Sequence, residues 1–284
     1  MTTLTTPAPE KTRLRPRWPL IVGIVLLVAI NLFPFYWMVL TSLKRGTELF
    51  TNPPSFFTLN PDIGAYLRLL SDSGFLTNAK NSVIISTGAT VLSIAVSAIA
   101  AYGLTRFTFP GSKAFSTSIL YAYTFAPIVI VVPLYGMFRD IGLINTYGGM
   151  ILAYASFGVP FSLWLLRPFF SSIPKEMEEA AFIDGANRVK SAWYVVFPQA
   201  TPGIIAVSVF TFLLAWEDYL FARVLITETS MKTLPVALYD LYNASLQDWP
   251  LLMAAATLVS LPVLLAFLFL QKYLIAGWGA GAIK

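Results

Sequence analysis

The chain carries its apolar residues in long, nearly uninterrupted blocks rather than at amphipathic helical spacing. The core of a lipid bilayer requires about 20 consecutive apolar residues per spanning helix. Six segments meet this requirement: about 19–43, 81–105, 114–138, 148–170, 202–226 and 251–275. The pattern predicts an all-α membrane protein with six transmembrane helices, in which residues 1–18 form an N-terminal arm and residues 19–284 one six-span domain.

The first apolar block resembles a secretory signal, because four basic residues precede it: Lys11, Arg13, Arg15 and Arg17. The block runs from Trp18 to about Leu43, which is longer than a signal core, and no small-residue cleavage site ends it. We therefore interpret it as an uncleaved first span.

Composition narrows the class further. Hydrophobic residues make up 57% of the 284 residues and charged residues only 12%, whereas a soluble domain carries about 25% charged residues. The mean hydropathy is +0.71. Cysteine and histidine are both absent, which excludes disulfides, zinc sites and catalysis by a histidine base or a cysteine nucleophile. We expect no catalytic residue and no metal site in this chain.

The distribution of basic residues predicts how the chain is oriented in the membrane. If the N-terminus is cytoplasmic, twelve of the 19 Lys and Arg residues fall on the inside and seven on the outside. Because inside loops are enriched in basic residues, both termini are predicted to be cytoplasmic. Most of these residues flank apolar blocks, so the net charge of +5 does not indicate a nucleic-acid partner. The first outside loop, about 44–80, is rich in proline and polar residues and is expected to form a small cap.

The only long inside loop, about 171–201, reads as a helix-turn-helix. Pro174 suits a first helical turn, and Gly185 can end that helix. Three acidic residues complement the N-terminal helix dipole: Glu176, Glu178 and Glu179. A second short helix, from about Arg188, is expected to stop before Pro198. The loop is where a partner protein would dock.

This loop contains Glu179-Ala180-Ala181, then Gly185, then Val195 and Phe197-Pro198. The spacing resembles the signature of ABC importer permeases, in which Ile and Leu usually stand at the positions of Val195 and Phe197. Further matches occur in order along the chain: Ala101-Tyr102-Gly103-Leu104-Thr105-Arg106, Phe109-Pro110-Gly111, Pro133-Leu134-Tyr135, Gly142-Leu143-Ile144-Asn145-Thr146-Tyr147, Trp216-Glu217-Asp218-Tyr219 and the tail from Gln271 to Lys284. The chain is similar to the carbohydrate branch of the family, and in particular to the smaller permease subunit of the maltose importer.

The resemblance implies a type I ABC importer permease fold in a bacterial or archaeal cytoplasmic membrane, and import of a di- or oligosaccharide or a sugar derivative. It implies three kinds of protein partner: a second homologous permease, an ABC ATPase dimer and an extracytoplasmic sugar-binding protein. The chain contains no G-x-x-x-x-G-K-[ST] loop, so ATP and Mg²⁺ are expected on the partner ATPase, with no cofactor here and no enzyme activity in this subunit.

The resemblance also implies roles for the loop residues. In related permeases the first loop helix sits in a cleft of the ATPase, and this coupling role carries over to Glu179, Ala180, Ala181, Asp184, Gly185 and Pro198. Small side chains at the alanines allow close contact, and Gly185 permits a sharp turn. The alternative is a helix hairpin on the membrane surface whose acidic residues are merely solvated.

Glu217 and Asp218 are interpreted as the only carboxylates within a span, about two-thirds of the way from its inside end. Carboxylates accept hydrogen bonds from sugar hydroxyls, and aromatic rings stack on sugar C–H faces. Trp216, Glu217, Asp218 and Tyr219 are therefore candidates for lining the sugar path. The alternative is that they form an interfacial belt or hold the second permease.

Two other classes of protein remain as alternatives. An ion-coupled secondary transporter would need buried coupling carboxylates, and only the Glu217–Asp218 pair offers them. A membrane-embedded enzyme would need a nucleophile and base or a metal site, for which a chain without histidine and cysteine has few means.

Overall fold

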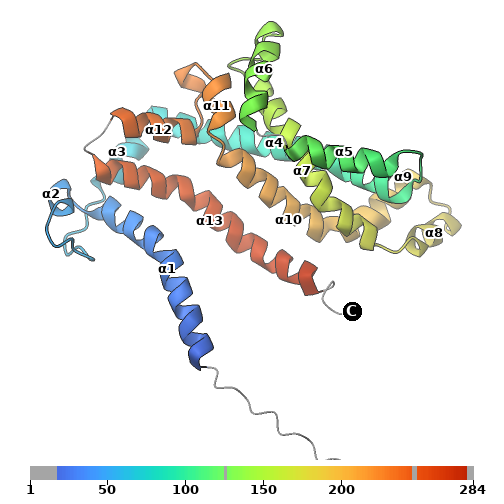
Figure 1. Cartoon of the computed structure of the whole chain (residues 1–284), viewed down its shortest axis with the longest axis horizontal. Helices are drawn as coiled ribbons and strands as arrows, with labels where there is room; N and C mark the ends of the chain where they lie inside the picture. Colours follow the sequence, from blue (N-terminus) through green and yellow to red (C-terminus); the bar gives the residue numbers. More distant parts are fainter. Residues whose placement is uncertain (1–17, 125–126, 245–247, 280–284) are drawn as a thin grey trace, which may run out of the picture.

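The computed structural model describes residues 18–124, 127–244 and 248–279, and every regular element among them is helical. The elements are α1 (Trp18–Leu43), α2 (Gly46–Leu49), α3 (Gly64–Ser71), α4 (Ser73–Arg106), α5 (Ser112–Thr124), α6 (Pro127–Asp140), α7 (Tyr147–Ser172), α8 (Glu176–Ile183), α9 (Arg188–Ser191), the π-helical turn η1 (Ala192–Val196), α10 (Phe197–Trp216), α11 (Leu220–Leu225), the 3₁₀ turn η2 (Thr229–Met231), α12 (Leu234–Ala244) and α13 (Trp249–Gly279). Figure 1 shows α8 and α9 at one end of the bundle and α2, α3 and α12 at the other.

Five helical stretches among the described residues are long and apolar enough to cross a membrane: Leu20–Leu43, Ser73–Arg106, Tyr147–Ser172, Arg188–Trp216 and Trp249–Phe269. They correspond to five of the six predicted spans. The second begins earlier than predicted, at Ser73 rather than at residue 81, because Asp72 caps it by accepting a hydrogen bond from Gly74 N at 2.8 Å.

The predicted third span, residues 114–138, is described as two helices, one on either side of residues 125 and 126. It is divided between α5 and α6, which contain 13 and 14 residues and run in different directions (Figure 1). A count of apolar residues cannot detect such a division, because both helices are apolar.

Helix α4 forms the centre of the bundle and packs against α7 and α10. Small residues allow the close approach. A Cβ at Gly88 would lie 2.5 Å from Ile151 Cδ1, and one at Gly158 would overlap the Ser93 side chain. Packing of small residues is the usual means by which spanning helices associate, because lipid leaves no hydrophobic force between them.

Two further features frame this core. The predicted cap at residues 44–80 contains α2 and α3, and Ala65 and Leu69 of α3 pack against Ala254 and Ala255 of α13. Helix α1 packs against α13, yet the most apolar stretch of α1 has no buried residue. Lipid or another chain must cover that face, since bare apolar surface of this size is costly in water.

Candidate functional sites: the α8 loop and the break after Trp216

Helix α8 presents the signature residues at its surface. Glu179, Ala180, Asp184 and Gly185 are exposed, and Ala181 is half-buried. Glu176, Glu178 and Glu179 lie in the first helical turn, as predicted. Pro174 does not lie in that turn: the helix begins two residues later, after Lys175. The exposed face is therefore available to a partner.

Gly185 ends α8 in the left-handed conformation, with φ of +83°. Gly185 N donates to Phe182 O at 3.1 Å, and Ala186 N donates to Ala181 O at 2.9 Å. This pair of hydrogen bonds defines a Schellman turn, which satisfies carbonyls that the helix end would otherwise leave free. The predicted helix end at Gly185 is confirmed.

The second loop helix begins at Arg188, as predicted, with Asn187 accepting a hydrogen bond from Lys190 N at 2.8 Å. It does not stop before Pro198. Helix α9 continues through the π-helical turn η1 into α10, in which Pro198 occupies the first turn. In a regular helix the proline ring would clash with the carbonyl four residues earlier. The wider π turn directly before Pro198 relieves that conflict.

Glu178 behaves unlike the other acidic residues of α8, because it is buried. Its carboxylate forms an ion pair with Arg106, the last residue of α4, and accepts a hydrogen bond from Tyr102 Oη at 2.9 Å. Arg106 also donates to Ile173 O at 3.0 Å. The sequence prediction missed this cluster. One signal for it was available, since Tyr102 and Arg106 stand four residues apart and so share a helix face.

At the break after Trp216, the predicted fifth span, residues 202–226, is interrupted. Helix α10 ends at Trp216, and α11 begins only at Leu220. Glu217 and Asp218 therefore lie in a break between helices and not within a span. The Asp218 side chain explains the break, because its Oδ2 accepts hydrogen bonds from Phe221 N at 3.0 Å and Ala222 N at 3.2 Å. A side chain that binds nearby backbone N–H groups competes with a continuous helix.

The side chains of Asp218 and Trp216 both form hydrogen bonds within the chain. Tyr154 Oη on α7 donates to Asp218 Oδ2 at 3.0 Å. The buried Trp216 ring donates from Nε1 to Val259 O on α13 at 3.1 Å, three residues before Pro262. The indole thus joins the end of α10 to the turn of α13 that precedes Pro262. These contacts join α7, α10 and α13 around the break.

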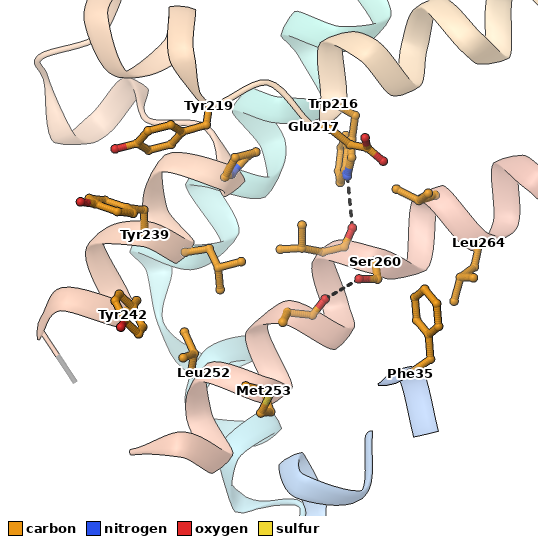
Figure 2. Close-up of a pocket in the computed structure, with 15 residues that line it drawn as sticks. Phe35, Trp216, Glu217, Tyr219, Tyr239, Tyr242, Leu252, Met253, Ser260 and Leu264 are labelled. Atoms are coloured by element: carbon orange, nitrogen blue, oxygen red, sulfur yellow. Dashed lines mark hydrogen bonds between the residues drawn. The ribbon is translucent and has the colours of Figure 1, made fainter. Parts of the chain in front are cut away.

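A cavity of about 680 Å³ opens beside the break, between α1, α12 and α13. Figure 2 shows three tyrosines on one side of it: Tyr219, Tyr239 and Tyr242. The rings of Tyr219 and Tyr239 lie 5.1 Å apart. Glu217 also lines the cavity, and its exposed carboxylate has no hydrogen bond or ion pair with any described residue. Glu217 is thus the carboxylate of the predicted pair that is free to bind a ligand.

Comparison with known proteins identifies the family. Residues 93–278 match the binding-protein-dependent transport system inner membrane components. The chain belongs to this family of ABC importer permeases. The chain is 32% identical over 269 residues to the trehalose/maltose transport system permease protein MalG of Thermococcus litoralis, covering 93% of this chain and 96% of MalG. It is 33% identical to the probable ABC transporter permease protein YurM of Bacillus subtilis, covering 89% of this chain and 83% of YurM.

A solved structure agrees in fold. A chain of a bacterial ABC transporter involved in the import of the acidic polysaccharide alginate is similar with a TM-score of 0.76 and 25% identity, over 92% of this chain and 99% of that chain. The protein is therefore a multi-pass inner-membrane permease subunit of the carbohydrate-uptake family. It is a subunit of a sugar importer in which a partner ATPase binds ATP. This membership decides against the ion-coupled secondary transporter.

Proposed function

We propose that this chain forms one half of the translocation path of a type I importer for a di- or oligosaccharide or a sugar derivative. The other half is a second, homologous permease, and the complex is completed by an ABC ATPase dimer and an extracytoplasmic sugar-binding protein. The names of relatives support the substrate class: one belongs to a trehalose/maltose system and another to a diacetylchitobiose uptake system.

We infer six membrane crossings with both termini in the cytoplasm. The third crossing is made jointly by α5 and α6, whose residues 112–140 together are long enough for a bilayer. The excess of basic residues on the side of α8 and α9 supports this orientation. In this topology α8 lies in the cytoplasm, where an ATPase is found, and the break after Trp216 lies toward the outside.

Helix α8 is the coupling helix of this proposal. The observation that carries it is an exposed Glu179-Ala180 face, followed by the sharp turn at Gly185, at one end of a bundle of spanning helices. Asp184 and Pro198 are exposed as well, and Ala181 is half-buried. Ile183 supports docking as well, because 87% of this apolar side chain is exposed in the isolated chain. Such residues gain stability when a partner covers them.

The cavity beside Glu217 borders the sugar path. Its volume of about 680 Å³ falls within the range of about 300–1,000 Å³ that is usual for ligand sites. The Glu217 carboxylate accepts hydrogen bonds from sugar hydroxyls, while Tyr219 and the exposed Tyr239 offer aromatic surface. Asp218 has a different role, since it holds the break in shape through Tyr154 and the start of α11.

The test is uptake of labelled trehalose, maltose and diacetylchitobiose by the complete importer in proteoliposomes. Transport of at least one should require both ATP and the binding protein. Glu217→Ala should raise the concentration of sugar at half-maximal uptake while the second permease stays bound. Glu228→Ala removes an exposed carboxylate that does not line the cavity and is the matched control. If Glu217→Ala instead releases the second permease, the residue belongs to the subunit interface and the path assignment is wrong.

A further inference from the structure

A buried ion pair joins the coupling helix to a spanning helix that is not its neighbour in sequence. The side chains of Arg106 on α4 and Glu178 on α8 are only 5% and 6% exposed. Tyr102 donates to the same carboxylate, and Arg106 also donates to Ile173 O in the segment between α7 and α8. One guanidinium therefore holds both a side chain of α8 and the backbone that leads into it.

The buried pair holds α4 and α8 together, because removing either partner leaves an uncompensated buried charge, which is strongly unfavourable. Aromatic contacts reinforce it. The Arg188 guanidinium of α9 lies 5.1 Å from the centre of the Phe107 ring, directly after α4, and 5.9 Å from that of Phe182 on α8. The end of α4 is thus bound to both short helices of the loop.

Toward its opposite end, α4 is hydrogen-bonded to the segment between α11 and α12 and to the start of α12. Asn81 is fully buried, and its side-chain N–H groups donate to Ser230 O at 2.9 Å and Lys232 O at 3.0 Å. Its carbonyl accepts from Tyr147 Oη at 2.6 Å. The next residue, Ser82, accepts from Leu234 N at 2.8 Å, at the start of α12. The segment between α11 and α12 is therefore held by α4.

Between Asn81 and Arg106, α4 is one continuous helix. It runs the length of the bundle (Figure 1), and about 38 Å separate Asn81 from Arg106 at about 1.5 Å per residue. The other four helical stretches long enough to span a membrane each contain an internal proline, which bends or weakens a helix. Helix α4 contains none within residues 73–106.

We propose that Arg106, Tyr102 and Glu178 are positioning residues that pass movement of α8 to α4, and that α4 carries it to the extracytoplasmic loop through Asn81. The inference rests on the proposed coupling role of α8. Closure of the ATPase displaces α8, and the buried ion pair makes α4 follow rather than slide past. The loop between α11 and α12, which leads into the cavity-lining helix α12, then shifts with it.

The chain contains no cysteine, so a single cysteine replacing the exposed Glu228 can carry a fluorophore that reports movement of this loop. Arg106→Gln and the milder Tyr102→Phe are compared in the complete importer with its binding protein. The matched control is Arg167→Gln, which removes an exposed arginine of α7.

In Arg106→Gln the complex should retain its basal ATP hydrolysis. Stimulation by sugar-loaded binding protein should fall about fivefold or more, the lower end of typical coupling between sites, and the ATP-dependent fluorescence change should be lost. Tyr102→Phe should show a smaller decrease of both, and Arg167→Gln none.

Wild-type stimulation and fluorescence in both Arg106→Gln and Tyr102→Phe would overturn the inference. So would a loss of assembled complex in which the remaining complexes couple normally, because that result assigns the cluster a structural role only. A wild-type importer that lacks both stimulation and a fluorescence change would instead contradict the proposed coupling function, which separates the two failures.

Discussion

The turn at Gly185 offers the sharpest test of coupling, because a change there acts through one identifiable cause. The residue has φ of +83°, and the two hydrogen bonds that close α8 depend on this conformation. A Cβ built at Gly185 meets no heavy atom within 4 Å. Within this chain, a substitution at this position therefore strains the backbone and does not disturb packing.

The expected cost follows from that geometry. An ordinary residue in the left-handed conformation costs about 1–2 kcal/mol, which changes the balance between a closed and an open turn by about 5- to 30-fold. Asparagine tolerates the conformation better than other side chains do. We therefore expect Gly185→Asn to be mild, Gly185→Ala to be intermediate and Gly185→Val to be most severe, since valine is β-branched and would also press on a docked ATPase.

The assay is ATP hydrolysis stimulated by sugar and binding protein in reconstituted complexes, with retention of the ATPase during purification followed in parallel. Gly185→Val should insert normally into the membrane yet couple weakly or lose its ATPase. Gly46→Val is the matched control, because its Cβ is also free of contacts while its φ is not positive. Wild-type stimulation and retention in Gly185→Val would refute the reasoning, as would equal losses in the valine and asparagine variants.

Two further predictions concern topology and the break after Trp216. A reporter fused after Lys190 should read cytoplasmic and one near Asp62 external; an external signal at Lys190 would place α8 on the wrong side for an ATPase. Asp218→Ala should lower the free energy of unfolding of the purified complex by about 0.5–2 kcal/mol, as is typical of a lost helix cap, and so lower its melting temperature. Asp218→Asn keeps an acceptor for Tyr154 and should have a smaller effect. An unchanged melting temperature in Asp218→Ala would show that the cap does not stabilise the break.

The parts of the fold that sequence predicted well are those fixed by strong local chemistry. Long apolar blocks require helices in a bilayer, because unpaired backbone groups cannot be tolerated there, and five of the predicted spans have such helices. The end of α8 at Gly185 and the start of α9 at Arg188 were likewise predicted from residue types that have few alternatives at those positions. Each of these features depends on only a few neighbouring residues.

The features that sequence missed depend on partners distant along the chain. Asp218 reads as a costly carboxylate inside an apolar run until Tyr154 and the N–H groups of α11 are seen to bind it. Glu178 reads as one of three equivalent acidic residues until Arg106, 72 positions earlier, is found beside it. In both cases the contacts of the carboxylate involve residues that are distant along the chain, and the local pattern could not indicate them. A buried charge reveals what it does only through its partner, because the partner decides whether the charge holds structure or is left free to bind. Of the two carboxylates predicted to lie together on the sugar path, Asp218 is hydrogen-bonded within the chain, whereas Glu217 has no such partner among the described residues and is the one that we propose binds sugar.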